Sequence, residues 1–191
     1  MIDLCTRNSG LLKCFLVVIG MLLCLSVGHA YKEHDHSQTS PAKKEKTKVV
    51  RLGEMSIPDV ELVNQDGERV RFYSDLVKDK VVAINFIFTT CTTICPPMGA
   101  NFAHLQKLMG DRVGKDVALI SVSVDAVVDT PKRLKAWGEK FGAGPGWTLL
   151  TGSKQNVDGL LKGLKIFTPD KIDHSPFILI GNETEGEWQR V

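Results

Sequence analysis

The stretch Val81–Met98, VVAINFIFTTCTTICPPM, decides the fold. Its run VVAINFIF is too short to span a membrane and is rich in β-branched and aromatic residues, which predicts a buried strand over Val81–Phe88. Two cysteines follow at a C-x-x-x-C spacing, Cys91 and Cys95, and then two prolines. Because a residue before proline is biased towards extended geometry, we expect a helix to begin at about Pro97. Both sulfurs would then lie on a loop between a central strand and a helix N-terminus.

This position favours thiol chemistry. A helix N-terminus stabilises negative charge, so it lowers the pKa of a nearby thiol and favours the thiolate. The thiolate is the form that attacks disulfides and binds soft metals. The pattern therefore predicts a redox or metal-binding role, and the structural alternative is a small loop disulfide or two buried apolar cysteines.

Length and composition indicate one globular domain with an extension. The chain has 191 residues, a 43% apolar fraction and a formal charge of +2, which gives no reason to propose nucleic acid as a partner. Residues 1–30 predict a secretory signal, with an apolar run followed by Gly28-His29-Ala30, which supplies the small residues of an A-x-A-like cleavage site. An uncleaved membrane anchor is the alternative, because Leu11–Val27 approaches the length of a span. We therefore expect an exported protein, periplasmic or anchored at the outer face of the inner membrane.

The rest of the chain predicts alternating strands and helices. Residues 31–54 begin with a polar, aperiodic stretch and are expected to form a flexible linker to a domain over residues 55–191. Strands that alternate with helices predict crossover connections and a largely parallel central sheet. The expected elements are a β-hairpin over Ile57–Phe72, strands over Val81–Phe88, Val117–Val124, Trp147–Leu150, Phe177–Ile180 and Trp188–Val191, and helices over Pro97–Met109, Pro131–Phe141 and Ser153–Leu164.

Three candidate site residues follow the ends of predicted strands. Cys91, Cys95 and Asp125 could share one edge of the sheet, where open α/β sheets bind their ligands. His174 lies on a loop that enters the strand Phe177–Ile180. Two thiolates and one imidazole would make a soft donor set suited to copper, but the spacing alone does not place His174 beside the cysteines.

Four motifs taken together resemble a known family. TTCTTICPPM, SVSVDAVVDTPKRLKAW, WTLLTGS and DHSPFILI are similar to the corresponding segments of the Sco/SenC family of thioredoxin-like copper proteins, over about residues 55–191. The resemblance implies an α/β, thioredoxin-like fold: a central mixed sheet flanked by helices, with an N-terminal β-hairpin. The C-terminal helix expected of that fold is absent from the sequence, so we expect an incomplete C-terminal end.

The same resemblance implies a site. It assigns a copper ion to Cys91, Cys95 and His174. It also carries over Asp125 and Asp129, from the family's DxxxDTP-type segment, as supporting residues.

The resemblance also implies a function. Family members deliver copper to the dinuclear copper site of cytochrome c oxidase, or reduce the cysteines of that site. We therefore predict a copper chaperone whose partner is the oxidase copper-site subunit or another copper or thiol protein, with membrane contact only through the N-terminal segment.

An enzymatic role remains open beside the chaperone. The alternative is a thiol–disulfide oxidoreductase in which Cys91 attacks and Cys95 resolves. The three residues between the cysteines argue mildly against efficient reductase chemistry. A peroxide-reducing relative is not favoured, because its attacking cysteine needs a nearby arginine and no arginine lies between Phe72 and Asp111.

Overall fold

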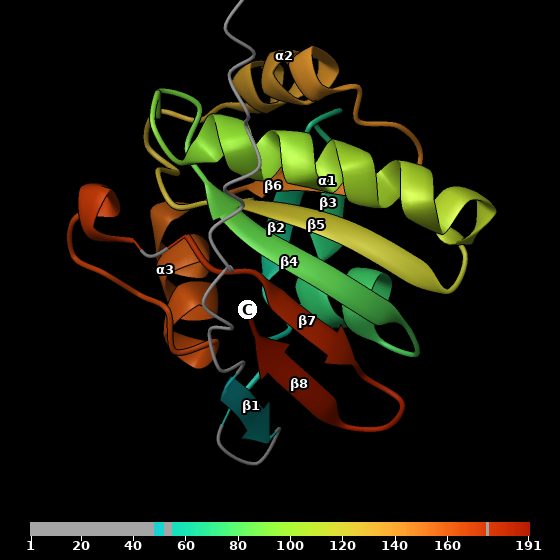
Figure 1. The fold of residues 1–191 in the computed structure, drawn as a ribbon. Coiled ribbons are helices and arrows are strands. Elements are labelled where there is room, and N and C mark those ends of the chain that lie inside the picture. The colour runs from blue at the N-terminus through green and yellow to red at the C-terminus, as the bar shows by residue number, and fades with distance from the viewer. Residues whose placement is uncertain (1–47, 52–54, 175) are drawn as a thin grey trace, which may run out of the picture. The chain divides into compact units, whose positions relative to one another are not determined.

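The computed structural model describes residues 48–51, 55–174 and 176–191. Eight strands form one mixed sheet in the order β1-β8-β7-β4-β5-β6-β2-β3 (Figure 1). No helix within these residues is long and apolar enough to cross a membrane. The strands are β1 (Lys48–Arg51), β2 (Glu61–Asn64), β3 (Arg69–Arg71), β4 (Val81–Ile87), β5 (Val117–Ser123), β6 (Trp147–Thr151), β7 (Leu179–Asn182) and β8 (Glu187–Arg190). The helices are α1 (Cys95–Met109), α2 (Pro131–Phe141) and α3 (Lys154–Gly163), with short helical segments η2 (Phe72–Val77), η3 (Gly110–Arg112) and η4 (Lys171–Asp173).

The centre of the sheet is its parallel part. Strand β4 pairs in parallel with β5, and β5 with β6, whereas every other strand pair is antiparallel. The mixed sheet is therefore confirmed, but the expectation of a largely parallel sheet holds only for these three strands. Both β4 and β5 are buried almost along their whole length, as their continuous apolar runs predict for strands covered on both faces.

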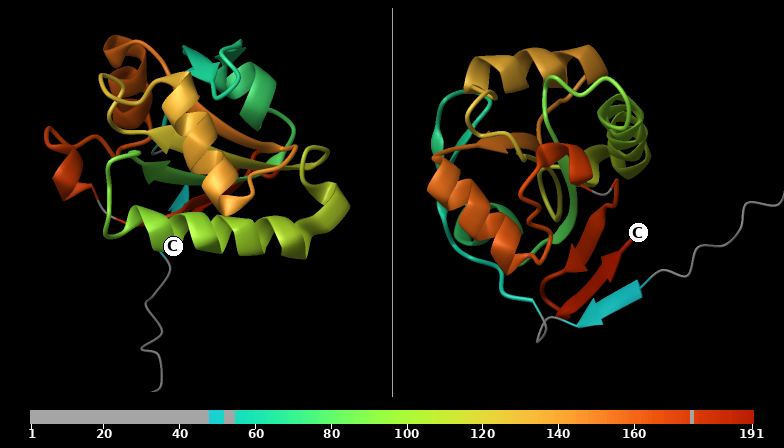
Figure 2. Two further views of the ribbon diagram at one scale, coloured as in Figure 1. Left: turned by 90° about the horizontal axis from the view of Figure 1, so that it is seen from above. Right: turned by 90° about the vertical axis from the view of Figure 1, so that its left-hand side faces the viewer.

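Helices cover both faces of this sheet (Figure 2). On one face, Phe102 of α1 and Leu134 of α2 pack against Ile87 and Leu119. On the other face, α3 and η2 pack over the alternate residues of the same strands. The alternation of side chains along each strand thus supplies two cores from one sheet.

Helix α1 begins earlier than the prolines predict. Its first residue is Cys95, so the expected start at about Pro97 is wrong by two positions. The first-turn N–H groups of a helix have no partner within the helix, so two prolines there remove no hydrogen bond. The other helix starts are confirmed, since the side chains of Thr130 and Ser153 accept hydrogen bonds at the N-termini of α2 and α3.

Some expectations about the strands also differ from the structure. Strand β7 begins at Leu179, two residues later than expected. Strand β1 lies inside the predicted linker, where it pairs antiparallel with β8. Residues 1–30 and most of the predicted linker lie outside the described residues.

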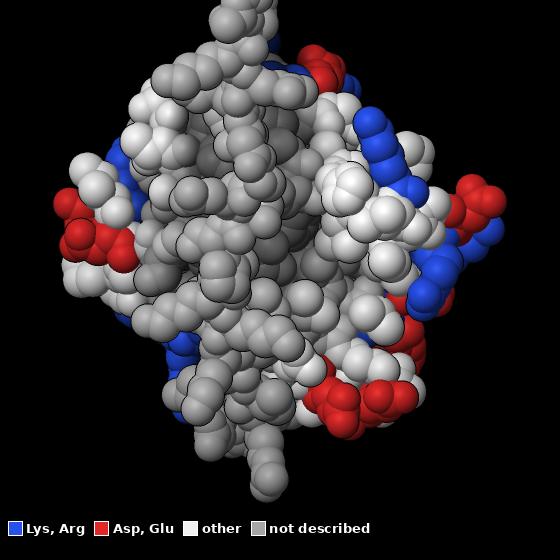
Figure 3. Space-filling view, viewed as in Figure 1, with Lys and Arg blue, Asp and Glu red and all other residues white. Residues whose placement is uncertain are grey.

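Charged side chains of both signs are interspersed on the described part of the face in Figure 3. Acidic and basic groups alternate along its edge. This distribution agrees with the small formal charge of the chain, +2.

Candidate functional site

The two cysteines lie where β4 leads into α1. The Cys91 N–H donates a hydrogen bond to the Phe88 carbonyl, 3.1 Å away, which turns the chain at the end of the strand. The Cys95 N–H points at the Cys91 sulfur, 3.4 Å away. Cys95 is fully buried and Cys91 is partly exposed. Cys91 is therefore the thiol that a partner can reach.

The surroundings shift the two thiol pKa values in opposite directions. Burial opposes ionisation of Cys91, but hydrogen bonds from the Cys95 thiol and from the Cys95 and Thr93 backbone outweigh it and lower the Cys91 pKa to about 7. Burial raises the pKa of Cys95 to about 12, helped by its hydrogen bond to Cys91. Near neutral pH one thiolate is thus available, and Cys91 carries it.

Asp129 fixes the segment that leads to Cys91. Its carboxylate accepts hydrogen bonds from the Thr89 N–H, at 3.1 and 3.2 Å, and from the Thr89 hydroxyl. The buried Ser123 hydroxyl donates a further bond of 2.7 Å. Asp129 is only 1% exposed, so these donors replace the water that a carboxylate needs. Asp129 thereby ties the exit of β4 to the end of β5.

Asp125 holds a different segment. Its carboxylate pairs with the Lys171 ammonium, which comes from η4 on the connection between α3 and β7. The Lys171 ammonium also lies 5.3 Å from the centre of the Phe88 ring. The two aspartates of one loop therefore anchor two separate stretches of chain, one leading to Cys91 and one leading to His174.

His174 is buried with one nitrogen free. Its Nδ1 lies 2.6 Å from the Lys171 carbonyl oxygen. Because a carbonyl oxygen only accepts, Nδ1 is the donor in this contact, and in the neutral imidazole the lone pair is then on Nε2. Nε2 is buried and has no hydrogen-bond partner among the described residues. The ring packs edge-on against Phe88, with centroids 5.5 Å apart, so His174 neighbours the loop that carries Cys91.

The five predicted site residues thus gather at one edge of the sheet, beyond the carboxyl ends of β4 and β5. In the described ranges, however, no group of three or more His, Cys, Asp and Glu side chains is close enough to hold a metal ion. The ligand set of Cys91, Cys95 and His174 stays a prediction.

The sequence did not predict which residues join the aspartates, the cysteine loop and His174 to one another. Thr89, Phe88 and Lys171 link the aspartates, the cysteine loop and the histidine. Lys171 and Asp125 are 46 positions apart, and no motif or spacing signals their pairing.

Comparisons with known proteins identify a family. A sequence model of the family described as SCO1/SenC matches residues 52–188. The SCO1 protein homolog of Bacillus subtilis (strain 168) is 39% identical over 128 residues, which cover 62% of this chain and 64% of that protein. The chain spans less than two thirds of the length of the first curated relatives that it matches.

Solved structures share the fold. ScoI of Bradyrhizobium japonicum with copper bound gives a TM-score of 0.55 at 26% identity, covering 63% of this chain and 79% of that one. BsSco, a member of the Sco family of cytochrome c oxidase assembly proteins in which a disulfide switch was identified, gives a TM-score of 0.58 at 30% identity. That match covers 76% of this chain and 86% of the other.

Proposed function

Since the chain belongs to the SCO1/SenC family, we propose that it binds a copper ion and delivers it to the dinuclear copper site of cytochrome c oxidase. The observation that carries the proposal is the Nε2 of His174, which is buried beside the cysteine loop and has no hydrogen-bond partner among the described residues. An imidazole nitrogen buried without a hydrogen-bond partner is costly, and a metal ion would satisfy it. The copper bound by the related ScoI and the oxidase-assembly role of the BsSco family support the same function.

The donor chemistry fits copper. Two sulfurs and one imidazole nitrogen are soft ligands that suit Cu(I). Cys91 supplies a thiolate near neutral pH, whereas Cys95 must release its proton when the ion binds. Because no three-ligand group is assembled in the described residues, the cysteine loop must close towards His174 when the ion binds.

Delivery follows from the unequal burial of the sulfurs. Cys91 is partly exposed, so a thiolate of the acceptor can replace it first, while Cys95 is buried in the first turn of α1. Both thiols must be reduced for binding, so copper loading and the redox state of the pair are linked.

The test is Cu(I) binding to the reduced full-length chain, measured by competition with a Cu(I) chelator. We expect one ion per chain, loss of tight binding in Cys91→Ser and Cys95→Ser, and at least tenfold weaker binding in His174→Ala. His104→Ala is the control, because His104 is exposed on α1 and should not matter. A His174→Ala protein that binds as tightly as the wild type would remove His174 from the ligand set. A wild-type chain that binds no Cu(I) would remove copper delivery altogether.

The difference between the pKa values of Cys91 and Cys95 favours a second function, thiol–disulfide exchange. The Cys91 thiolate attacks a partner disulfide, forming a mixed disulfide and releasing one partner thiolate. Cys95 then loses its proton and attacks the Cys91 sulfur, which releases the second partner thiol and leaves a Cys91–Cys95 disulfide. Two electrons thereby pass from the pair to the partner. In Cys95→Ser the mixed disulfide should accumulate with a disulfide peptide of the oxidase subunit, and its absence would argue against this activity.

Export of the chain is part of the proposal. Residues 1–30 would act as a signal peptide or membrane anchor and place the domain outside the cytoplasm, where the copper site of the oxidase subunit is assembled. N-terminal sequencing of the mature protein distinguishes the two, because cleavage near Ala30 removes the segment and an anchor retains it.

A further inference from the structure

In its described residues, the segment that carries His174 has one ion pair to the rest of the domain. Residues 167–177 are the middle of the connection from α3 to β7, and their backbone bonds are internal, such as Asp173 N–H to the Asp170 carbonyl at 3.2 Å. Within the described part of this segment, the Lys171–Asp125 ion pair is the one hydrogen bond or ion pair that reaches another element.

Lys171 makes contacts through both its side chain and its backbone. Its ammonium pairs with Asp125 on the loop after β5, beside the Phe88 ring. Its carbonyl oxygen accepts the Nδ1 proton of His174. The ion pair therefore holds Lys171, and the Lys171 carbonyl in turn holds the His174 imidazole. The Lys171 ammonium and the His174 ring both contact the Phe88 ring.

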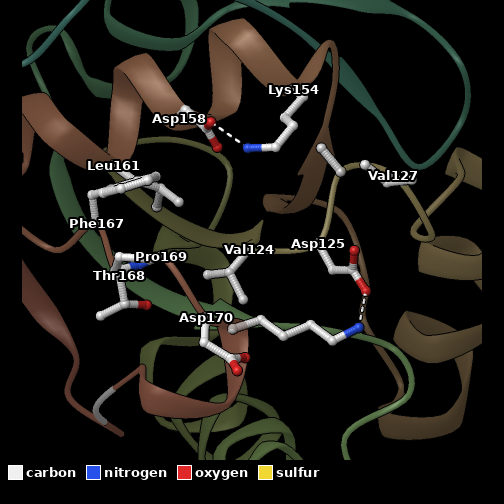
Figure 4. A pocket seen from close by; sticks show the side chains of 12 residues that line it. Val124, Asp125, Val127, Lys154, Asp158, Leu161, Phe167, Thr168, Pro169 and Asp170 are labelled. Atoms are coloured by element: carbon white, nitrogen blue, oxygen red, sulfur yellow. Dashed lines mark hydrogen bonds and ion pairs between the residues drawn. The ribbon is translucent and has the colours of Figure 1, made fainter.

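The pair is sheltered from solvent. The Asp125 side chain is 11% exposed and the Lys171 side chain 35% exposed. Partly buried charges are screened by salt less than exposed ones. The pair also borders a cavity of about 310 Å³, formed by the loop after β5, α3 and the His174 segment (Figure 4).

We propose that Lys171 and Asp125 are positioning residues for His174, and that their ion pair holds the histidine segment in the place from which it supplies the third copper ligand. The copper part of this inference rests on the proposed function, whereas the anchoring of the segment does not. Without the pair, the segment spends less time in the competent arrangement, and the apparent affinity falls with that fraction.

The experiment compares variants of the full-length reduced chain. Lys171→Met and Asp125→Asn remove the pair, and Lys171→Arg keeps a cation in its place. Lys154→Met is the matched control, because Lys154 lines the same cavity and pairs with Asp158 within α3, away from His174. The readouts are Cu(I) affinity and the amide hydrogen exchange of residues 168–174 in the metal-free chain.

We expect Lys171→Met and Asp125→Asn to bind Cu(I) about tenfold more weakly, as for other residues that orient metal ligands. Exchange in residues 168–174 should be faster in both variants, with other segments unchanged. Lys171→Arg should restore affinity and protection, and Lys154→Met should change neither. Exchange and affinity that match the wild type in Lys171→Met would overturn the inference.

The failure of the proposed function is distinguishable from the failure of this inference. If His174→Ala leaves Cu(I) affinity unchanged, the ligand set fails, and hydrogen exchange alone decides whether Lys171 anchors the segment. If His174→Ala weakens binding and Lys171→Met does not, the ligand set holds and the positioning role is wrong.

Discussion

Cys91 and Cys95 are separated by three residues, yet their environments favour opposite charge states. Cys91 sits partly exposed and accepts hydrogen bonds from the first turn of α1, which lowers its pKa to about 7. Cys95 is enclosed by the core and its pKa is raised to about 12. The asymmetry makes Cys91 the group that first meets copper or a partner sulfur.

Alkylation of Cys91 by iodoacetamide tests this asymmetry. Because the thiolate is the nucleophile, the rate should rise with pH and reach half its maximum near pH 7, below the value of about 8.5 for an ordinary thiol. Peptide mapping by mass spectrometry assigns the label. Cys95→Ala removes a hydrogen bond to the thiolate, so its midpoint should move to higher pH. A wild-type midpoint near 8.5 would contradict the prediction.

Asp129 should matter for stability as well as for the site. In Asp129→Ala the Thr89 N–H and the Ser123 hydroxyl lose their acceptor, which should lower the free energy of unfolding by about 2–3 kcal/mol. Urea denaturation measures this change. Asp116→Ala is the control: its carboxylate is 57% exposed and pairs with Arg112, so the loss should stay within about 0.5 kcal/mol. If the free energy of unfolding falls equally in the two variants, the buried hydrogen bonds of Asp129 stabilise the fold no more than an exposed ion pair does.

The sequence predicted the candidate redox and metal-binding residues but not the residues that position them. Cys91, Cys95 and His174 carry motif signals. Lys171 carries none, because a lysine on a loop predicts only a solvated charge, and its pairing with Asp125 exists only once the connection after α3 folds back over the strand ends.

Helix and strand positions were predictable where local chemistry decides them. Thr130 and Pro131 start α2 as expected, and Gly142 ends it with the left-handed backbone, φ 71°, that glycine accommodates. The start of α1 at Cys95 and the strand β1 were missed. In α1 the two prolines fall in the first turn, where their missing N–H groups remove no hydrogen bond. Strand β1 has only four residues, KVVR, which are too few to show an alternating pattern.

Two glycines of α3 make a matched pair of predictions. A Cβ at Gly159 would meet nothing within 4 Å, so Gly159→Ala should raise the free energy of unfolding by about 0.5–1 kcal/mol through helix propensity. A Cβ at Gly163 would lie 2.4 Å from Pro58 Cγ and 2.7 Å from the Ser56 carbonyl oxygen, so Gly163→Ala should lower it by about 1–3 kcal/mol. Urea denaturation of both variants measures the difference. The same sign for both would mean that α3 does not pack against residues 56–58 as the structure has it.

The sheet brings together three stretches that are far apart in sequence. The cysteine loop leaves β4, the aspartate loop leaves β5, and the His174 segment enters β7, which flanks β4 on the side opposite β5. A parallel register from Val81↔Val117 to Ile87↔Ser123 aligns the ends of β4 and β5. An ion held by the cysteine loop and the His174 segment together therefore needs the folded chain.

Copper should consequently stabilise the whole domain. At a free Cu(I) concentration 100 times the Kd, mass action predicts a rise of about 2.7 kcal/mol in the free energy of unfolding of the reduced chain. Anaerobic urea denaturation with buffered Cu(I) measures the rise, and removing the ion with a chelator should reverse it. The oxidised chain should show no rise, because a Cys91–Cys95 disulfide leaves no thiolate at the proposed site. Cys91→Ser should also lose it, and a rise that survives this substitution would place the ion on other sulfurs, among which the full-length chain offers Cys5, Cys14 and Cys24.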